Sequence, residues 1–449
     1  GGCPELPFGL ATSVGQLPCG NPAEAVRMAL RAQPEFPTIP VLAGAESSLL
    51  AQAVAGLRGV QVVPPGLLVV GGEFDPSAVP DAGPVGSEFE VFEEFLATDR
   101  DPGTGVRVAV LGPVTLALAL RAAAVPTETA VDLAAELAAT RAARILGAVR
   151  SSSTAGAGGG SSGGPVLVCA SEPGLIGAVH PTFPLTPAQV LDLLVPFVDA
   201  LDQHPLAGEL MIGVHVPGRT DWQTIIASGV SVISLPADRS LVRWADALGG
   251  FLDRGGRVVW GAVPVDQPLG TGEELLWRRL SAVWCELVGE GMDPLVLRSR
   301  SLVGPVDGLG HFGMRHGGCR DCIDATDHSL HKLGEIPWRL RASKGHLQRR
   351  PHAGRLGHGA FGLGLELLVE GLAFLVQDQP QPQSRQVRLD PLPDQRRGVI
   401  ADQPRRLIDF ARGFLAHLLP PVQHPVPRGA GHPCLTGNVM DGRTVCHLI

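Results

Sequence analysis

The hydrophobic and polar positions of the first 310 residues alternate between short apolar runs and longer amphipathic stretches. Several runs, such as Met211-Ile212-Gly213-Val214, have no polar face, which is typical of a strand buried on both faces of a parallel sheet. The runs that predict strands are Leu10–Val14, Val106–Leu111, Val166–Ala170, Leu210–His215, Val230–Leu235, Arg257–Val263 and Ser301–Val303.

The stretches between these runs carry signals for the start of a helix. Asn21 precedes a proline, which suits an N-cap followed by the first helical position. Three further segments have the spacing of a capping box, and they are Ser87-x-x-Glu90, Thr186-x-x-Gln189 and Thr271-x-x-Glu274. Because parallel strands need a crossover, this alternation predicts a parallel sheet. Seven or eight units in about 300 residues favour a closed (β/α)8 barrel, with an open doubly wound sheet as the alternative.

The charge balance changes abruptly near residue 310. Residues 1–310 hold 18 Lys and Arg against 32 Asp and Glu, whereas residues 311–449 hold 18 against 12 and 11 of the 14 His. We therefore divide the chain into a barrel domain, 1–310, and an unrelated, poorly packed, irregular tail, 311–449. A frameshift would also produce this change. Within the barrel, the Gly- and Ser-rich stretch 151–164 predicts a flexible insertion after a long helix over about 127–149.

Composition excludes several classes of protein. No apolar stretch reaches the ~18 residues that a membrane-spanning helix needs, so we expect no membrane partner. A net charge of −8 gives no reason to expect nucleic acid as a partner. Eight cysteines without a regular framework suit a reducing compartment, and we expect a cytoplasmic protein.

Polar segments follow the predicted strands, where the working residues of a (β/α)8 barrel are found. Five of them, in chain order, are Thr12-Ser13-Val14-Gly15-Gln16-Leu17-Pro18, Gly112-Pro113-Val114-Thr115, Ser171-Glu172-Pro173-Gly174-Leu175, His215-Val216-Pro217 and Pro305-Val306-Asp307-Gly308-Leu309. Their order and spacing over residues 9–310 resemble the C-terminal catalytic domain of cobalamin-independent methionine synthase and its shorter relatives, which share the barrel of uroporphyrinogen decarboxylase.

The resemblance implies a homocysteine S-methyltransferase of methionine biosynthesis. Its partners would be a small-molecule thiol and a methyl-folate donor, and its cofactor would be zinc. A bound Zn²⁺ keeps a thiol deprotonated at neutral pH, and the thiolate is the nucleophile. By the same resemblance, His215 and Glu172 would be the catalytic residues.

The metal ligands implied by the resemblance are His215 and Asp307. His215 stands at the histidine ligand of the family, whereas Pro217 and Asp307 stand at its two cysteine ligands. Proline offers no donor atom, and aspartate is a harder ligand that suits other metals as well. Glu73 is a candidate for the remaining glutamate ligand, and the thiols of Cys19 and Cys169 are candidates for others.

The substrate-binding residues implied by the resemblance are Gly15, Gln16, Ser171 and Glu172. Gln16 stands where the family has a small serine beside the substrate carboxylate, and Ser171 stands where it has the aspartate that holds the substrate amino group. Glu172 is retained from the family pattern.

Several other interpretations remain open. His215 could be a histidine of the core, Glu172 could cap a loop, and Asp307-Gly308 could form a plain turn. Loss of both cysteine ligands favours a catalytically silent barrel that binds a small molecule or partner. A uroporphyrinogen-decarboxylase-like enzyme is a third hypothesis, which the acidic body supports little. In the tail, Cys319-x-x-Cys322 with His328 and His331 resembles a zinc site in composition.

Overall fold

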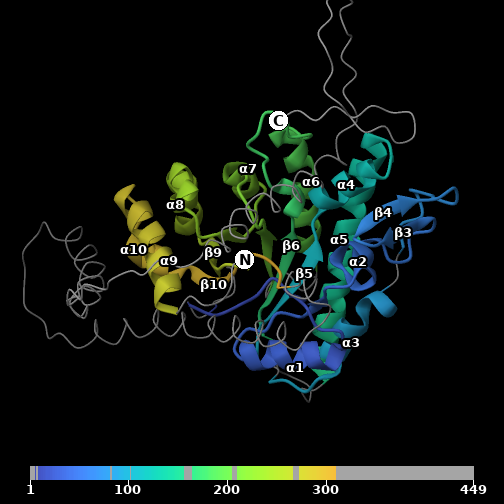
Figure 1. The fold of residues 1–449 in the computed structure, drawn as a ribbon, viewed down its shortest axis with the longest axis horizontal. Helices are drawn as coiled ribbons and strands as arrows, with labels where there is room; N and C mark the ends of the chain where they lie inside the picture. Colours follow the sequence, from blue (N-terminus) through green and yellow to red (C-terminus); the bar gives the residue numbers. More distant parts are fainter. Residues whose placement is uncertain are drawn as a thin grey trace, which may run out of the picture. The chain divides into compact units, whose positions relative to one another are not determined.

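A computed structural model describes residue 6 and residues 9–80, 83–101, 103–155, 164–204, 210–265 and 273–309. Its main sheet has six parallel strands in the order β10-β9-β8-β7-β6-β5, which curl around a common interior (Figure 1). These strands are β5 (Val106–Leu111), β6 (Val166–Ser171), β7 (Leu210–His215), β8 (Val232–Pro236), β9 (Arg257–Val263) and β10 (Ser301–Pro305). All six lie within one or two residues of the runs that predicted them.

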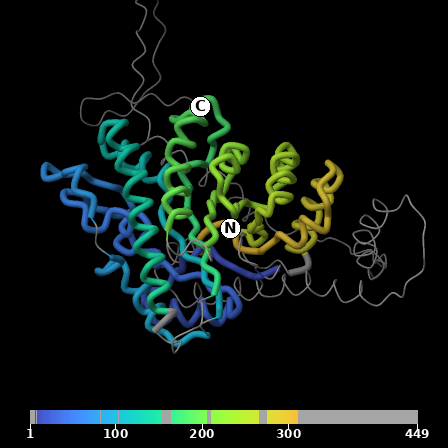
Figure 2. The backbone as a smooth tube through the Cα atoms, turned by 180° about the vertical axis from the view of Figure 1, so that it is seen from behind, coloured from blue at the N-terminus to red at the C-terminus, as the bar shows by residue number. Residues whose placement is uncertain are grey.

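Three α-helices of the described residues precede β5, and the other seven, which connect the six strands, lie along the outer face of the sheet, as seen from behind in Figure 2. In chain order, these helices are α1 (Pro22–Ala32), α2 (Leu49–Val54), α3 (Glu90–Ala97), α4 (Pro113–Ala122), α5 (Thr127–Ala155), α6 (Pro187–Asp202), α7 (Trp222–Ala227), α8 (Ala245–Asp253), α9 (Glu273–Gly289) and α10 (Pro294–Ser299). Short 3₁₀ segments are η1 (Ala45–Ser47), η2 (Ser87–Phe89), η3 (Pro173–Leu175) and η5 (Arg239–Trp244).

The predicted starts of two helices are confirmed. Asn21 caps α1 by accepting a hydrogen bond from the N–H of Glu24, with proline at the first helical position. Thr186 and Gln189 form a complete capping box at the start of α6. In both places a side chain satisfies a backbone N–H that has no partner within the helix.

The N-terminal segment lies against both edges of the six-stranded sheet. Ala11 forms a parallel bridge with Val303 of β10, and Thr38 forms one with Arg107 of β5. Between these contacts, β1 (Gln16–Leu17) pairs in parallel with β2 (Val41–Leu42). The prediction of a strand over Leu10–Val14 is therefore wrong, because the pairing of this segment with β10 is a single bridge at Ala11.

The α/β class with a parallel sheet is confirmed, but the described residues form a six-stranded sheet rather than eight regular strands. The departure lies in the first hundred residues, where the two edge positions hold only short paired segments. An antiparallel hairpin, β3 (Val60–Val63) and β4 (Leu67–Val70), stands there in addition and has no counterpart among the predicted strands.

Two local predictions need correction. Ser87 does not form a capping box with Glu90, because Gly86 at φ +115° leads into η2 and α3 begins only at Glu90. Helix α5 continues to Ala155, so the first residues of the predicted insertion 151–164 are helical. Thr271, the rest of that insertion up to residue 163, and the tail 311–449 with its Cys319–His331 cluster lie outside the described residues.

The core has an inner and an outer part. Inside the curled sheet, a buried apolar cluster joins the strands to the N-terminal segment, and its members include Leu10, Phe36, Leu167, Met211, Val232, Val259 and Leu302. On the outer face, Trp260 packs edge-on against Trp284 of α9 with ring centroids 5.9 Å apart. Its indole N–H donates to Ser301 Oγ at 2.8 Å, so Trp260 is a packing residue of the core.

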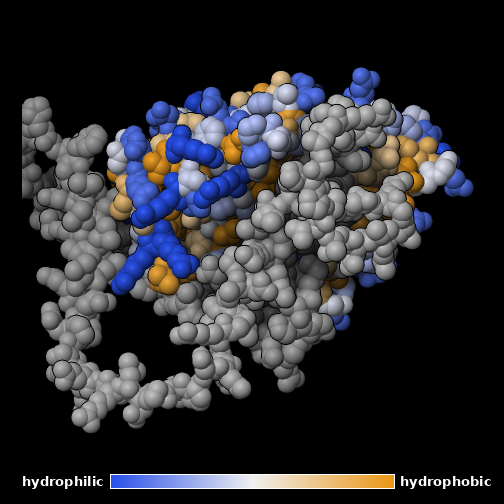
Figure 3. Space-filling model, turned by 45° about the horizontal axis from the view of Figure 1, so that its top comes forward, coloured by the Kyte–Doolittle hydropathy of each residue, from blue (hydrophilic) through white to orange (hydrophobic). Residues whose placement is uncertain are grey.

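The outer surface mixes polar and apolar side chains. Figure 3 shows hydrophilic side chains interspersed with smaller apolar areas on the described part of one face. None of the helices in the described ranges is both long enough and apolar enough to cross a lipid bilayer.

Candidate functional site at the carboxyl end of the sheet

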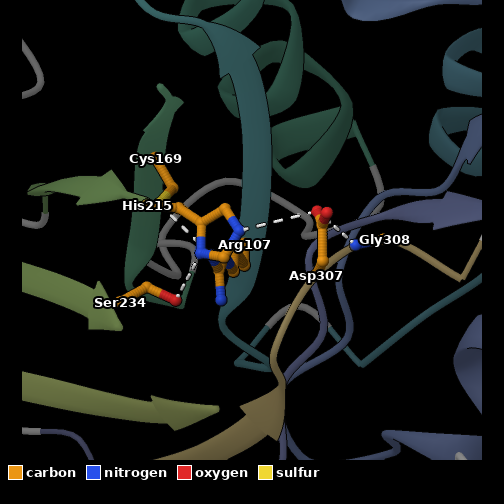
Figure 4. Close-up of polar contacts among 6 residues, drawn as sticks. All are labelled: Arg107, Cys169, His215, Ser234, Asp307 and Gly308. Carbon is orange, nitrogen blue, oxygen red and sulfur yellow. Dashed lines mark hydrogen bonds and ion pairs between the residues drawn. The ribbon is translucent and has the colours of Figure 1, made fainter. Parts of the chain in front are cut away.

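His215 is the last residue of β7, and its side chain is buried at the carboxyl end of the sheet. Its register neighbours are Ser171 on β6 and Ser234 on β8. The imidazole Nδ1 lies 2.9 Å from Ser234 Oγ, which fixes the orientation of the ring (Figure 4). The other ring nitrogen, Nε2, is buried with no hydrogen-bond partner in the described structure.

Asp307 faces this second nitrogen. It follows β10, and its Oδ1 lies 3.9 Å from His215 Nε2, which is an ion-pair distance and longer than a hydrogen bond. The same oxygen accepts the N–H of Gly308 at 2.7 Å, so Asp307 also forms the turn expected of an Asp-Gly pair. Two of the predicted site residues, His215 and Asp307, are thus brought together.

The charge state of His215 follows from its surroundings. Burial lowers the pKa of His215, the neighbouring Asp307 raises it in part, and the positive charge of Arg107 lowers it further. Because the net direction is downward, the imidazole is neutral at pH 7, with one nitrogen as donor and one as acceptor.

Gln16 contacts the residues that follow Asp307. Its carbonyl accepts the N–H of Leu309 at 2.9 Å, and its side chain packs over Gly308, where an added Cβ would stand 2.7 Å from Gln16 Oε1. Gly15 precedes it with φ +102°, a conformation that suits glycine. Both residues therefore position the N-terminal segment beside the turn at Asp307.

Glu172 is directed to a different place. Its carboxylate accepts the N–H groups of Val114 and Thr115 at 2.9 and 2.7 Å, and the hydroxyl of Thr115 at 2.6 Å. These atoms belong to the first turn of α4, so Glu172 caps that helix from the neighbouring strand. Burial raises the pKa of Glu172 to about 7, although the same hydrogen bonds act in the opposite direction. The cap accounts for the buried carboxylate, and its predicted contact with a ligand stays a prediction.

Arg107 is the charged residue that the sequence analysis missed. It lies on β5, is 1% exposed, and donates from Nη2 to the Sγ of Cys169 at 3.2 Å. Figure 4 draws its guanidinium beside the ring of His215. The signal in the sequence was a single charge inside the otherwise apolar run Val106–Leu111, which is costly unless the charge has a role.

The described residues do not fit the zinc site that the resemblance implies. His215 Nε2 and Asp307 Oδ1 are two donors, and Pro217 supplies none. No group of three or more His, Cys, Asp or Glu in the described part of the chain could hold a metal ion. In addition, the guanidinium of Arg107 places a positive charge beside His215, where it would repel a cation.

The surroundings of the other three candidate ligands, Cys169, Cys19 and Glu73, do not favour metal binding together with His215 and Asp307. Cys169 is buried and bonded to Arg107, and burial raises the pKa of its thiol. Cys19 follows β1, and burial together with the charge of Glu24 raises its pKa to about 11. Glu73 is exposed on the turn after β4. A thiol with a raised pKa is a poor metal ligand at neutral pH.

The comparisons with known proteins find a distant likeness in structure and none in sequence. No family model matches the chain, and no curated protein matches it. Among solved structures, the chain is similar to a protein from Listeria monocytogenes described as a "Putative Vitamin-B12 Independent Methionine Synthase", with a TM-score of 0.43 and 11% sequence identity. The match covers 71% of this chain and 85% of that one.

Proposed function

We propose that residues 9–309 form a variant (β/α)8 barrel of the methyltransferase type that binds a small molecule over His215. The observation that carries the proposal is the Nε2 atom of His215, which is buried at a strand end without a hydrogen-bond partner in the described structure. The opposite nitrogen is held by Ser234, so the ring is oriented with Nε2 towards Asp307.

A buried polar atom without a partner lowers stability by roughly 1–3 kcal/mol, and a contact with a bound molecule is one way to remove that cost. The carboxyl ends of parallel strands are also where barrel enzymes place their ligand contacts. A bound molecule that reaches Nε2 would remove this penalty. This supports His215 as the central contact, with Asp307 and Gln16 beside it.

The reaction we propose is methyl transfer to a homocysteine-like thiol from a methyl-folate donor. The basis of this proposal is the order in which the five strand-end segments follow one another along the chain. The thiol would give its proton to Nε2 of neutral His215 while its sulfur bonds to the methyl carbon and the donor's nitrogen–carbon bond breaks. The folate nitrogen, which leaves with the electron pair of that bond, would then take up the proton from His215. Ser171 and Gln16 would contact the amino acid part of the substrate. Zinc at His215 and Asp307 remains a prediction of the resemblance, and no step above depends on it.

A second candidate function is binding without catalysis. Two observations favour it: Pro217 provides no ligand, and the positive charge of Arg107 acts on His215, where it would disfavour a bound cation. In this case the same contacts over His215 would hold a small molecule that is not transformed.

The test uses the full chain, with His215→Ala, His215→Gln and the control His180→Ala, whose residue is exposed and bonded to Thr182. Homocysteine binding is measured by calorimetry, methionine formation with methyl-folate, and zinc by elemental analysis. Circular dichroism shows whether each variant folds. Binding that is lost in both His215 variants and kept in His180→Ala supports the site, whereas equal binding in all overturns it. Methionine formation that depends on His215 supports methyl transfer, and binding without turnover supports the second candidate.

A further inference from the structure

Arg107 carries N–H groups that the fold leaves without partners. Its Nη2 donates to Cys169, but Nε and Nη1 are buried and have no hydrogen-bond partner in the described structure. An arginine has five N–H donors, and a thiol is a weak acceptor for even one of them. The interior of the sheet therefore contains a guanidinium whose hydrogen bonds are mostly unmade.

The sheet makes room for this guanidinium in one row of small side chains. Ala109, Cys169 and Gly213 are register partners on β5, β6 and β7, and Cys169 contacts Arg107. The row nearer the strand starts holds Leu167 and Met211, which belong to the apolar core.

The row nearer the strand ends holds His215. The long side chain of Arg107 thus rises from the core towards the carboxyl end of the sheet. The register places Arg107 one row before the row of Cys169, which it contacts, and His215 one row after it, and the positive charge of Arg107 acts on the imidazole of His215.

An unpaired cation in this position needs an anion. Moving a charged group out of water without a counter-ion is strongly unfavourable, and a carboxylate or another oxyanion offers the acceptor oxygens that a guanidinium binds best. His215 can add one donor through Nε2 in the tautomer whose Nδ1 accepts the Ser234 hydroxyl, which is the opposite tautomer to the one that takes the thiol proton. The carboxylate of Asp307 accepts the N–H of Gly308 and faces His215, so it would repel an incoming anion and lower its affinity.

We propose that Arg107 and His215 together bind an oxyanion group, in the first place the carboxylate of a small molecule, at the inner end of the site. The inference rests on the proposed function, since it names the chemical class of the ligand that lies over His215. Arg107 then acts as the binding residue for the anion. The small side chains of Ala109, Cys169 and Gly213 leave space for its guanidinium to extend towards the strand ends.

The experiment measures thermal unfolding of the full chain in chloride-free buffer with rising concentrations of acetate or inorganic phosphate, and with acetamide as the uncharged match for acetate. The variants are Arg107→Met, Arg107→Lys and Asp307→Asn. The control Arg219→Met removes a cation that is 68% exposed and paired with Asp238. Binding to the folded state alone raises the melting temperature, and the rise grows with the logarithm of the anion concentration once this exceeds the dissociation constant.

We expect acetate to raise the melting temperature of the wild type and of Arg219→Met, and acetamide to have no effect. Arg107→Met should weaken acetate binding about tenfold or more, the loss of one charge-assisted contact. The acetate affinity of Arg107→Lys should lie between those of Arg107→Met and the wild type. Asp307→Asn should bind acetate more tightly than the wild type does. Without added anion, Arg107→Met should melt no lower than the wild type, because it removes an unsatisfied group.

A larger response to phosphate than to acetate would assign the site to a phosphate group within the same chemistry. If neither anion stabilises the wild type, or if Arg107→Met responds as the wild type does, the inference is overturned. The proposed function is judged separately by homocysteine binding in the His215 variants. Loss of that binding without any response to anions would refute only the anion site, and absence of both would refute the two proposals together.

Discussion

The backbone N–H of Glu172 donates a hydrogen bond of 2.8 Å to the carbonyl oxygen of His215. This bond extends the pairing of β6 with β7 by one residue beyond the strand ends and joins two predicted site residues through their main chains. Their side chains then part, since Glu172 caps α4 and His215 turns to Ser234 and Asp307. The position of His215 therefore depends on the cap that Glu172 provides.

Replacing Gly112 with alanine should destabilise the protein by about 1–3 kcal/mol, the usual range for overpacking a core. Gly112 is the N-cap of α4 with an ordinary φ of −77°, so its backbone tolerates a side chain. Its added Cβ, however, would overlap the carboxyl group of Glu172. Urea unfolding measures the effect.

The matched control is Gly147→Ala in α5, where an added Cβ meets nothing within 4 Å. That change should stabilise the protein by about 0.5–1 kcal/mol, because alanine favours a helix interior. In a Glu172→Ala background, Gly112→Ala should have a much smaller effect, since the overlap is gone. Additive effects of the two changes would contradict the proposed contact.

Glu172 should make stability fall between about pH 4.5 and 7. Its pKa is raised by burial from 4.5 to about 7, so in this window the folded protein holds a proton that the unfolded chain has released. One such proton gives a slope of about −1.4 kcal/mol per pH unit in the free energy of unfolding. Glu172→Gln removes this contribution, and the difference between the two pH profiles isolates it from other groups. Parallel profiles would show that Glu172 keeps an ordinary pKa.

The imidazole of His215 should remain neutral to a lower pH than an exposed histidine does. Burial lowers its pKa, so its contribution to stability is present above about pH 6.5, the ordinary histidine value, and is lost as the pH falls through the folded pKa. Asp307→Asn should lower this pKa further, because the carboxylate raises it. A nitrogen-detected NMR titration of the ring measures both values. Asp238→Asn serves as the control and should leave His215 unchanged.

Thr186→Ala should lower the free energy of unfolding by about 1 kcal/mol, the typical effect of losing an N-cap. The threonine hydroxyl accepts the N–H of Gln189 and completes the capping box of α6. Thr98→Ala is the control, since its exposed hydroxyl bonds only to the carbonyl of Glu94, and its effect should stay within about 0.5 kcal/mol. Chemical denaturation of both variants compares the two hydroxyls.

The six main strands could be predicted because each is buried on both faces of the sheet and is therefore a continuous apolar run in the sequence, long enough to be recognised. β1 and β2 could not, since two residues each leave no periodicity to detect. Ala11 and Thr38 form single bridges whose partners, Val303 and Arg107, are distant in sequence. Such pairing depends on tertiary structure and leaves no local pattern.

The candidate site was predictable in its position and less so in its chemistry. Strand-end polarity located His215, Asp307 and Gln16, which the structure brings together. The strand-end segments predict metal ligands, whereas Arg107 lies inside the apolar run Val106–Leu111, which predicts only a strand. The register of β5, β6 and β7 places Arg107 below His215. Residue spacing along one strand does not predict which residues of the neighbouring strands lie beside it.

The bridge between Ala11 and Val303 also sets the order in which the molecule can assemble. It joins the first and last paired segments of the described chain, so a ribosome must finish β10 before the N-terminal segment finds its partner. Contacts of such high sequence separation form slowly, and until then one edge of the sheet stays open to other strands. The Asp307 turn, which packs on Gln16, is therefore completed only at the end of folding, and chaperone dependence would be expected at this step.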